Sequence, residues 1–254
     1  MTTGVLIFAF NNEEIDYVKI AKWSAKNIER HLGLPTHIIT EEEVEPEGVY
    51  SRKFDDLSNS VTWYNGNRVD AYALSPFDRT IVLDADYVVA SDQLKCLLDL
   101  DQDFVAHKKA YDITDHPNFD EHNYFGNYRM PMWWATVMMF RRSQHAESIF
   151  ESMQMIKSNW NHYKSLYQIG RTTYRNDFAL SIALGIVNGH TLDYPAIPWD
   201  LPTVTHDQKL TQIDQDTYRV DFVTQDKRPK WVQLRQDFHA MGKGQLGEIV
   251  DSNS

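Results

Sequence analysis

The sequence predicts an α/β fold with a central, mostly parallel sheet flanked by helices and a β-rich C-terminal part. Three observations predict it. Residues 4–10 form an apolar run typical of a buried strand, apolar residues then recur at helical spacing up to Leu32, and residues 36–40 form a second strand-like run. A strand, a helix and a strand in this order make a β-α-β unit, which is the seed of a parallel sheet.

The remaining elements follow from caps and periodicity. Asn11 to Glu14 provide an N-cap and acidic residues for the first turn of the first helix, and Gly33 and Pro35 end it. Residues 41–60 are polar, with an acidic stretch at 41–47, and show little pattern. The next expected elements are a helix over about 62–75, strands at 79–84 and 87–90, a helix at 93–98 and a strand at 104–107.

The second half starts with a long loop, residues 110–132, which is rich in Asp, His, Tyr and Pro. Loops of this length in a compact domain are usually functional. A strand at 135–140, a helix at 144–167 and a helix at 176–186 capped by Asn176 follow, and strands and turns dominate from residue 190. No linker separates the two halves, so residues 1–254 are expected to form one domain.

The composition excludes some classes of protein. No apolar run approaches the length that spans a bilayer, and the N-terminus lacks the signature of a signal peptide. Cys96 is the only cysteine, so no intrachain disulfide can form and a reducing cytoplasm is expected. The net charge of −11 argues against a large nonspecific nucleic-acid surface, although residues 227–235 are locally basic.

The most informative motif is Asp84-Ala85-Asp86, which ends the apolar run of residues 79–83. Two carboxylates one residue apart at a strand end converge on one point, and hard oxygen ligands suit Mg²⁺ or Mn²⁺. Such ions often share their coordination sphere with substrate phosphates. The motif therefore indicates an enzyme that handles a phosphorylated donor; the alternative is a solvated turn that only ends a strand.

A second group of polar residues lies in the long loop. It comprises Asp112, Asp115, His116, Asp120 and His122. As metal ligands these residues would indicate a hydrolase. The favoured interpretation is a polar acceptor loop without metal.

Together the motifs resemble a GT-A (Rossmann-like) glycosyltransferase, most nearly the glycogenin-like retaining group, and more weakly the glycosyltransferases of bacterial viruses. The resemblance covers most of the chain and rests on ordered motifs. These are the opening strand with Asn11 and Tyr17, Arg68, Asp84-Ala85-Asp86, the strand 135–139, Asn176-Asp177-Phe178 and His239-Ala240-Met241-Gly242-Lys243.

The resemblance implies roles for these residues. Residues 1–108 would bind the nucleotide sugar, and residues 109–254 would bind the acceptor and supply the C-terminal metal-ligand motif. It implies metal ligation by Asp84, Asp86 and His239, and catalytic roles for Asp86 and Asp177. It implies acceptor contacts from Trp133 and Trp134. The residues that would contact the nucleotide sugar are Phe10, Asn11, Tyr17, Arg68, Asp84, Ala85, Asp86, Gly242 and Lys243. The cofactor would be Mn²⁺ or Mg²⁺, and the donor a nucleotide-diphosphate sugar such as a UDP-sugar.

Some positions depart from the family pattern. The acceptor strand lacks the usual Asn-x-Gly, Phe178 replaces a frequent Gln, and Lys243 follows Gly242 directly. These departures affect the acceptor more than the donor. The expected function is transfer of a hexose or pentose to a hydroxyl, with a hydroxymethylated DNA base of a phage as one candidate acceptor. A nucleotide-sugar hydrolase and a non-catalytic sugar- or nucleic-acid-binding module are the alternatives.

Overall fold

The computed structural model describes residues 2–40, 49–53, 64–116, 119–170, 173–191 and 193–253, with only the backbone described at 49–53 and 64–66. The acidic stretch at 41–47 lies outside these residues. Helices are α1 (Tyr17–Leu32), α2 (Ala71–Leu74), α3 (Gln144–Ser158), α4 (Trp160–Leu166), α5 (Asn176–Val187) and α6 (Lys243–Ser252). Short 3₁₀ helices span Tyr64–Asp70, Gln93–Asp99 and Phe119–Asn123.

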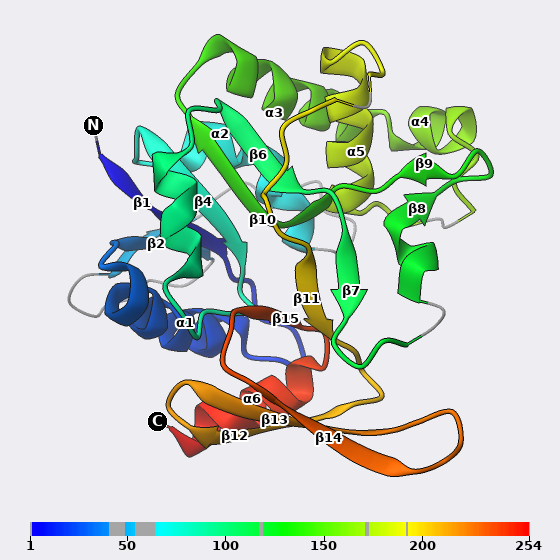
Figure 1. Ribbon diagram of the computed structural model, residues 1–254. Coiled ribbons are helices and arrows are strands. Elements are labelled where there is room, and N and C mark those ends of the chain that lie inside the picture. Colours follow the sequence, from blue (N-terminus) through cyan, green and yellow to red (C-terminus); the bar gives the residue numbers. More distant parts are fainter. Residues whose placement is uncertain are drawn as a thin grey trace.

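The described strands form four sheets (Figure 1). The first has the order β3-β2-β1-β4-β10-β6, with β3 (Val49–Lys53), β2 (Thr36–Thr40), β1 (Thr3–Phe8), β4 (Arg79–Asp84), β10 (Trp134–Arg141) and β6 (Phe104–His107). The second has the order β5-β15-β11-β7, with β5 (Tyr87–Val88), β15 (Phe238–Ala240), β11 (Leu201–Val204) and β7 (Ala110–Asp112). The third joins β12 (Lys209–Asp214), β13 (Thr217–Val223) and β14 (Pro229–Leu234), and the fourth β8 (Tyr124–Phe125) and β9 (Met130–Pro131).

The central sheet is mostly parallel, as predicted. Strands β3, β2, β1 and β4 pair in parallel, and only β10 runs antiparallel to its neighbours β4 and β6. The chain moves outward from β1 to β2 and β3 and then returns to place β4 on the other side of β1. This reversal is the topological switch point, beside which open α/β sheets form their ligand crevices. The predicted α/β fold and β-rich C-terminal part are confirmed.

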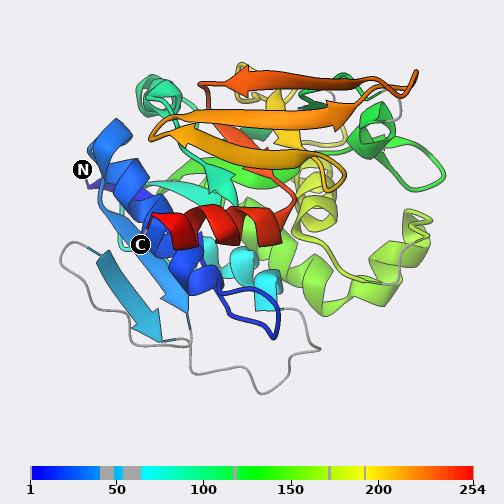
Figure 2. The same ribbon diagram turned by 90° about the horizontal axis from the view of Figure 1, so that it is seen from below.

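Helices cover this sheet. Helix α5 contacts both β10 and α3, whereas α1 packs on β1 and β2 (Figure 1). Figure 2 shows α6 beside α1 and beneath the three-stranded sheet, and α6 contacts both α1 and β12. None of the helices in the described part of the chain is long and apolar enough to cross a membrane.

Several predicted boundaries were wrong for physical reasons. Helix α1 begins at Tyr17, because Asn11 and Asn12 use their side chains to hold the preceding loop and Asp16 caps Lys19 instead. Asn159 separates α3 from α4, since its side chain donates to Met155 O, 2.9 Å away.

Other differences concern missed or altered elements. The cap of α5 is Arg175 rather than Asn176, and the expected helices at 62–75 and 93–98 are largely or wholly 3₁₀. The loop 110–132 contains three short strands and a 3₁₀ helix. Helix α6 was missed, although Leu246, Ile249 and Val250 are buried at helical spacing.

His107 gives the fold a pH-dependent term that can be measured. Its imidazole is fully buried and bonds Trp199 O at 2.9 Å, and burial lowers the pKa of His107 from 6.5 to about 4. The unfolded chain therefore binds a proton between those pH values that the folded chain does not, so stability is lost as pH falls from 6.5 toward 4.

We expect His107→Asn to flatten that dependence. The group contributes about 3 kcal/mol of pH-dependent stability over this interval. Urea unfolding at pH 7 and pH 4.5 measures the difference, and the wild type should lose more free energy of unfolding than the variant, whatever the variant's stability at pH 7. Equal losses in both proteins would show that His107 does not carry the pH dependence.

Candidate active site

The site begins where two central strands end. Strands β1 and β4 are parallel neighbours, and their register places Phe8 beside Asp84. The chain turns at Ala85 and Asp86 and enters β5 at Tyr87. Ala85 is small and 5% exposed, so the two carboxylates lie on either side of it without crowding.

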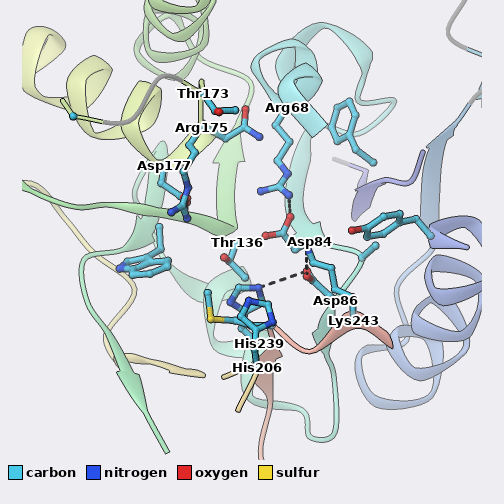
Figure 3. A pocket seen from close by; sticks show the side chains of 17 residues that line it. Arg68, Asp84, Asp86, Thr136, Thr173, Arg175, Asp177, His206, His239 and Lys243 are labelled. Atoms are coloured by element: carbon cyan, nitrogen blue, oxygen red, sulfur yellow. Dashed lines mark hydrogen bonds and ion pairs between the residues drawn. The ribbon is translucent and has the colours of Figure 1, made fainter. Parts of the chain in front are cut away.

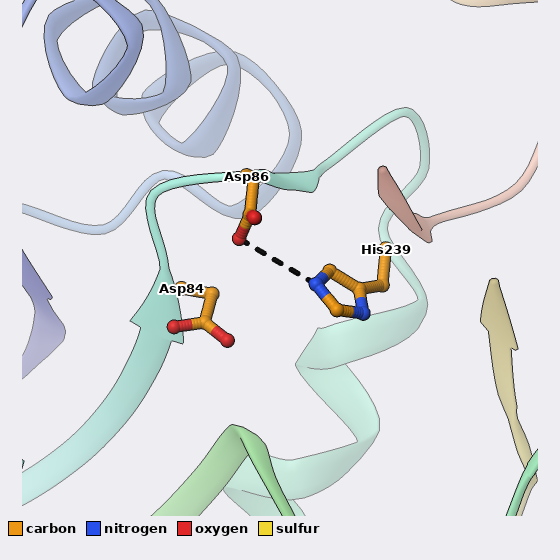
Figure 4. Close-up of side chains that lie close together, drawn as sticks. All are labelled: Asp84, Asp86 and His239. Carbon is orange, nitrogen blue, oxygen red and sulfur yellow. Dashed lines mark ion pairs between the residues drawn. The ribbon is translucent and has the colours of Figure 1, made fainter. Parts of the chain in front are cut away.

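The C-terminal part reaches this turn through strand pairing. Strand β15 pairs with β5 so that His239 lies opposite Tyr87, and Ala240 N donates to Asp86 O at 2.9 Å. The imidazole of His239 is thereby held next to Asp86, with Nε2 3.6 Å from Asp86 Oδ1 (Figure 4). A sheet between segments 150 residues apart in sequence therefore completes the cluster.

The donor set of this cluster fits a divalent cation. One ligand atom each from Asp84, Asp86 and His239 lies within 4.8 Å of the others, and all three residues are buried. His239 Nδ1 has no hydrogen-bond partner among the described residues, so the imidazole is not committed elsewhere. Two carboxylates and an imidazole suit Mn²⁺ better than Mg²⁺, which prefers oxygen ligands alone. Among the residues described, these three are the only group of this kind.

Cations compensate the carboxylates. Arg68 pairs with Asp84, and Lys243 Nζ lies 3.5 Å from Asp86 Oδ2 and 5.5 Å from the ring centroid of Tyr17. Burial raises the pKa of Asp86, but His239 and Lys243 outweigh it and hold that pKa well below its usual range. Asp86 in turn raises the pKa of Lys243. Asp86 is therefore ionised throughout the neutral range.

The opposite wall is built by α5 and the start of β10. Asp177 Oδ1 accepts from Ala135 N at 2.9 Å, and its Oδ2 accepts from Arg175 at 2.7 Å. Ser181 adds a second link between the elements, because its Oγ accepts from Trp133 N at 2.7 Å. The pairing of β10 with β6 is irregular between Trp134 and Met138, so the strand departs from the sheet where it meets α5. Asp177 is thus fixed in place.

These groups surround one pocket of about 610 Å³ (Figure 3). Its lining comprises Phe8, Tyr17, Arg68, Asp84, Ala85, Asp86, Trp134, Thr136, Gly170, Thr173, Arg175, Asn176, Asp177, His206, His239, Met241 and Lys243. Most predicted site residues are therefore brought together. The predicted residues outside the lining are Phe10, Asn11, Trp133 and Gly242.

Those four residues pack in the core or hold the ends of helices. Phe10 is 2% exposed in the core, and Asn11 accepts from Val18 N at 3.0 Å at the start of α1. Gly242 is the N-cap of α6. Trp133 is buried, with its ring edge-on to Tyr194.

Sequence reasoning missed His206, Arg175 and Thr173. His206 lies in the turn after β11, whose parallel neighbours are β7 and β15. The turn is held by buried Asp112, whose Oδ2 accepts from Thr205 Oγ1 at 3.1 Å and from Gln208 Nε2 at 2.6 Å. Local spacing gives no signal for His206, because a residue distant in sequence holds its turn.

The polar cluster of the long loop does not converge on a metal site in the described part of the chain. Asp112 is fully engaged in hydrogen bonds, and it also accepts from Thr114 N at 2.7 Å. Asp115, His116, Asp120 and His122 are exposed.

The chain matches no protein-family model, and no curated protein matches its sequence. Among solved structures it is similar to the glycosyltransferase GlyE of Streptococcus pneumoniae TIGR4, with 13% identity, a TM-score of 0.48, and coverage of 78% of this chain and 46% of GlyE. This chain thus spans less than half the length of GlyE.

Two further similar structures are glycosyltransferases. One is galactosyltransferase LgtC in complex with donor and acceptor sugar analogs, with 14% identity, a TM-score of 0.48, and coverage of 72% of this chain and 70% of LgtC. The other is the bifunctional glycosyltransferase WbbM, with 16% identity, a TM-score of 0.44, and coverage of 73% of this chain and 37% of WbbM. The roles of this chain's residues rest on its own geometry.

We expect Asp86→Asn to weaken Mn²⁺ binding by at least about tenfold, because it removes a charged ligand while keeping the side chain's size. Isothermal titration with Mn²⁺ in the presence of UDP measures the change. Asp221→Asn, which alters a carboxylate that pairs with Arg219 on β13 outside the pocket, is the control. Wild-type Mn²⁺ affinity in Asp86→Asn would remove this residue from the metal site.

Proposed function

We propose that this chain is a metal-dependent glycosyltransferase that moves a sugar from a nucleoside-diphosphate sugar to a hydroxyl acceptor. The observation that supports it best is the Asp84–Asp86–His239 cluster on the floor of a pocket that also holds Arg68 and Lys243. A bound divalent cation would supply Lewis-acid stabilisation of the departing diphosphate.

The charges of the pocket support a cation–diphosphate pair. Its lining holds the carboxylates of Asp84, Asp86 and Asp177 and the cations of Arg68, Arg175 and Lys243, which balance one another. A divalent cation adds two positive charges, and a nucleoside diphosphate joined to a neutral sugar adds about two negative charges. The loaded pocket is then neutral again, which limits the cost of burying charge.

The two walls of the pocket contact different parts of the donor. Tyr17 offers an aromatic face for the base, and Lys243 lies between it and Asp86, where it can hold diphosphate oxygens. A sugar extending away from Tyr17 reaches the wall of Asp177, a carboxylate that can accept hydrogen bonds from sugar hydroxyls or lie near the reacting carbon. The site thus orients the donor across the cation-binding cluster.

The acceptor side is framed by Trp134 and the His206 turn. A hydroxymethylated DNA base is one candidate acceptor, since a base flipped out of the stack could lie against an aromatic wall. The basic stretch 227–235 could contact the DNA backbone despite the net charge of −11. The other candidate acceptor is a saccharide or protein hydroxyl.

A transfer assay tests the proposal. The purified chain is incubated with UDP-hexoses and UDP-pentoses, with Mn²⁺ or EDTA, and with hydroxymethylated DNA, plain DNA or simple glycosides. Transfer that depends on Mn²⁺ and is lost in Asp86→Asn supports the function, and the productive acceptor identifies the substrate class. Hydrolysis of the donor at the same rate with and without every acceptor would instead indicate a hydrolase.

Asp177→Asn should reduce turnover by roughly 100-fold while leaving UDP affinity within about twofold of wild type. The amide can still accept from Ala135 N, but the negative charge that faces the sugar is lost. Lys243→Gln is the matched comparison, since it should weaken UDP binding instead. Turnover near the wild-type rate in Asp177→Asn would show that Asp177 only connects α5 to β10 and does not act on the sugar.

A further inference from the structure

Arg68 joins the cation-binding cluster to the opposite wall of the pocket. Arg68 is 8% exposed, its Nη2 pairs with Asp84, and its Nη1 donates to Ala135 O at 3.2 Å. The peptide of Ala135 is also engaged on its other side, because Ala135 N donates to Asp177. The guanidinium is therefore held against a proposed metal ligand by a second bond to β10.

We propose that Arg68 is a positioning residue that competes with a divalent cation for Asp84 and so makes cation binding depend on the diphosphate. This inference rests on the proposed function only in placing a cation and a diphosphate at this site. A buried guanidinium in contact with Asp84 repels a dication at the same carboxylate, and burial weakens the screening of that repulsion.

A diphosphate reverses the sign of this interaction. Its oxygens can bind the cation and accept hydrogen bonds from the guanidinium, so that two attractive contacts outweigh the repulsion that remains between the two cations. Arg68 Nε is buried without a hydrogen-bond partner among the described residues, so the protein leaves one N–H of the guanidinium unsatisfied. By linkage, the diphosphate must tighten cation binding by the same factor as the cation tightens diphosphate binding.

Arg175 provides a matched control within the same pocket. It carries the same charge, lines the same cavity and pairs with Asp177 at 2.7 Å rather than with a member of the cation-binding cluster. Removing its charge tests the general electrostatic effect of the pocket. Only Arg68 tests competition for Asp84.

The experiment measures Mn²⁺ binding by electron paramagnetic resonance, with and without saturating UDP. In the wild type, UDP should tighten Mn²⁺ binding at least about fivefold. In Arg68→Gln, Mn²⁺ alone should bind at least about fivefold more tightly than in the wild type, and the enhancement by UDP should shrink. Arg68→Lys keeps the charge and should stay within about twofold of wild type for Mn²⁺ alone, as should Arg175→Gln.

Several outcomes would overturn the inference. Wild-type Mn²⁺ affinity that does not change with UDP would do so without any variant, even if Arg68→Gln fails to fold. Unchanged or weaker binding of Mn²⁺ alone in a folded Arg68→Gln, or equal tightening in Arg175→Gln, would also overturn it. Failure of the wild type to bind Mn²⁺ even with UDP would instead contradict the proposed metal-dependent function itself.

Discussion

The pocket depends on mutual compensation of buried charges. Asp84, Asp86 and Asp177 are each 8% exposed or less, and an unpaired buried carboxylate is strongly destabilising. Each has a cationic partner: Arg68 for Asp84, Lys243 for Asp86 and, two residues earlier in the chain, Arg175 for Asp177. The first two pairs join different elements. Charge pairing therefore fixes where the elements that carry these residues can lie, and the same groups are then available to a charged ligand.

Backbone hydrogen bonds give this charge cluster its geometry. The pairing of β5 with β15 places His239 at Asp86, and the peptide of Ala135 is shared by Arg68 and Asp177. Main-chain groups of strands move less than long side chains do, so the carboxylates and the imidazole are positioned before any ligand arrives. Preorganisation of this kind lowers the cost of binding and of stabilising developing charge.

The sequence was informative for features that depend on residues close together in the chain. The apolar runs predicted β1, β2 and β4, and the carboxylates at the end of β4 indicated the centre of the site. It was less informative where distant residues decide the outcome. His206 lies in the pocket only because the Asp112 network holds its turn, and no spacing near His206 reveals that network.

Failures within elements have a similar origin. Asn11 is a good N-cap by type, but its side chain reaches Val18 N across a loop, so the helix starts later than the sequence suggests. Helix α6 is short and follows a run of strands. The helical spacing of Leu246 and Ile249 was therefore overlooked, because the surrounding segments predict strands. Whether Phe10 contacts a nucleotide sugar, as the resemblance implies, depends on how the chain after β1 packs, and this depends on the whole fold.

Phe178, at the head of α5, has a packing role. The Phe178 ring stacks on Trp160 at 6.0 Å and lies 5.6 Å from Phe125, so it belongs to an aromatic cluster behind the pocket wall. The head of α5 therefore presents Asp177 to the pocket without a polar neighbour at the next position.

Trp134 is equally constrained. Its ring stacks on Phe119 and its Nε1 donates to Asn123 Oδ1 at 3.2 Å, which prevents it from turning to follow a ligand. The pocket therefore has a wall whose shape exists before any ligand binds, with Asp177 and Arg175 as its charged groups. Asp177 and Arg175 pair with each other at 2.7 Å on this wall, so their charges are compensated before any ligand binds, as those of the cation-binding cluster are.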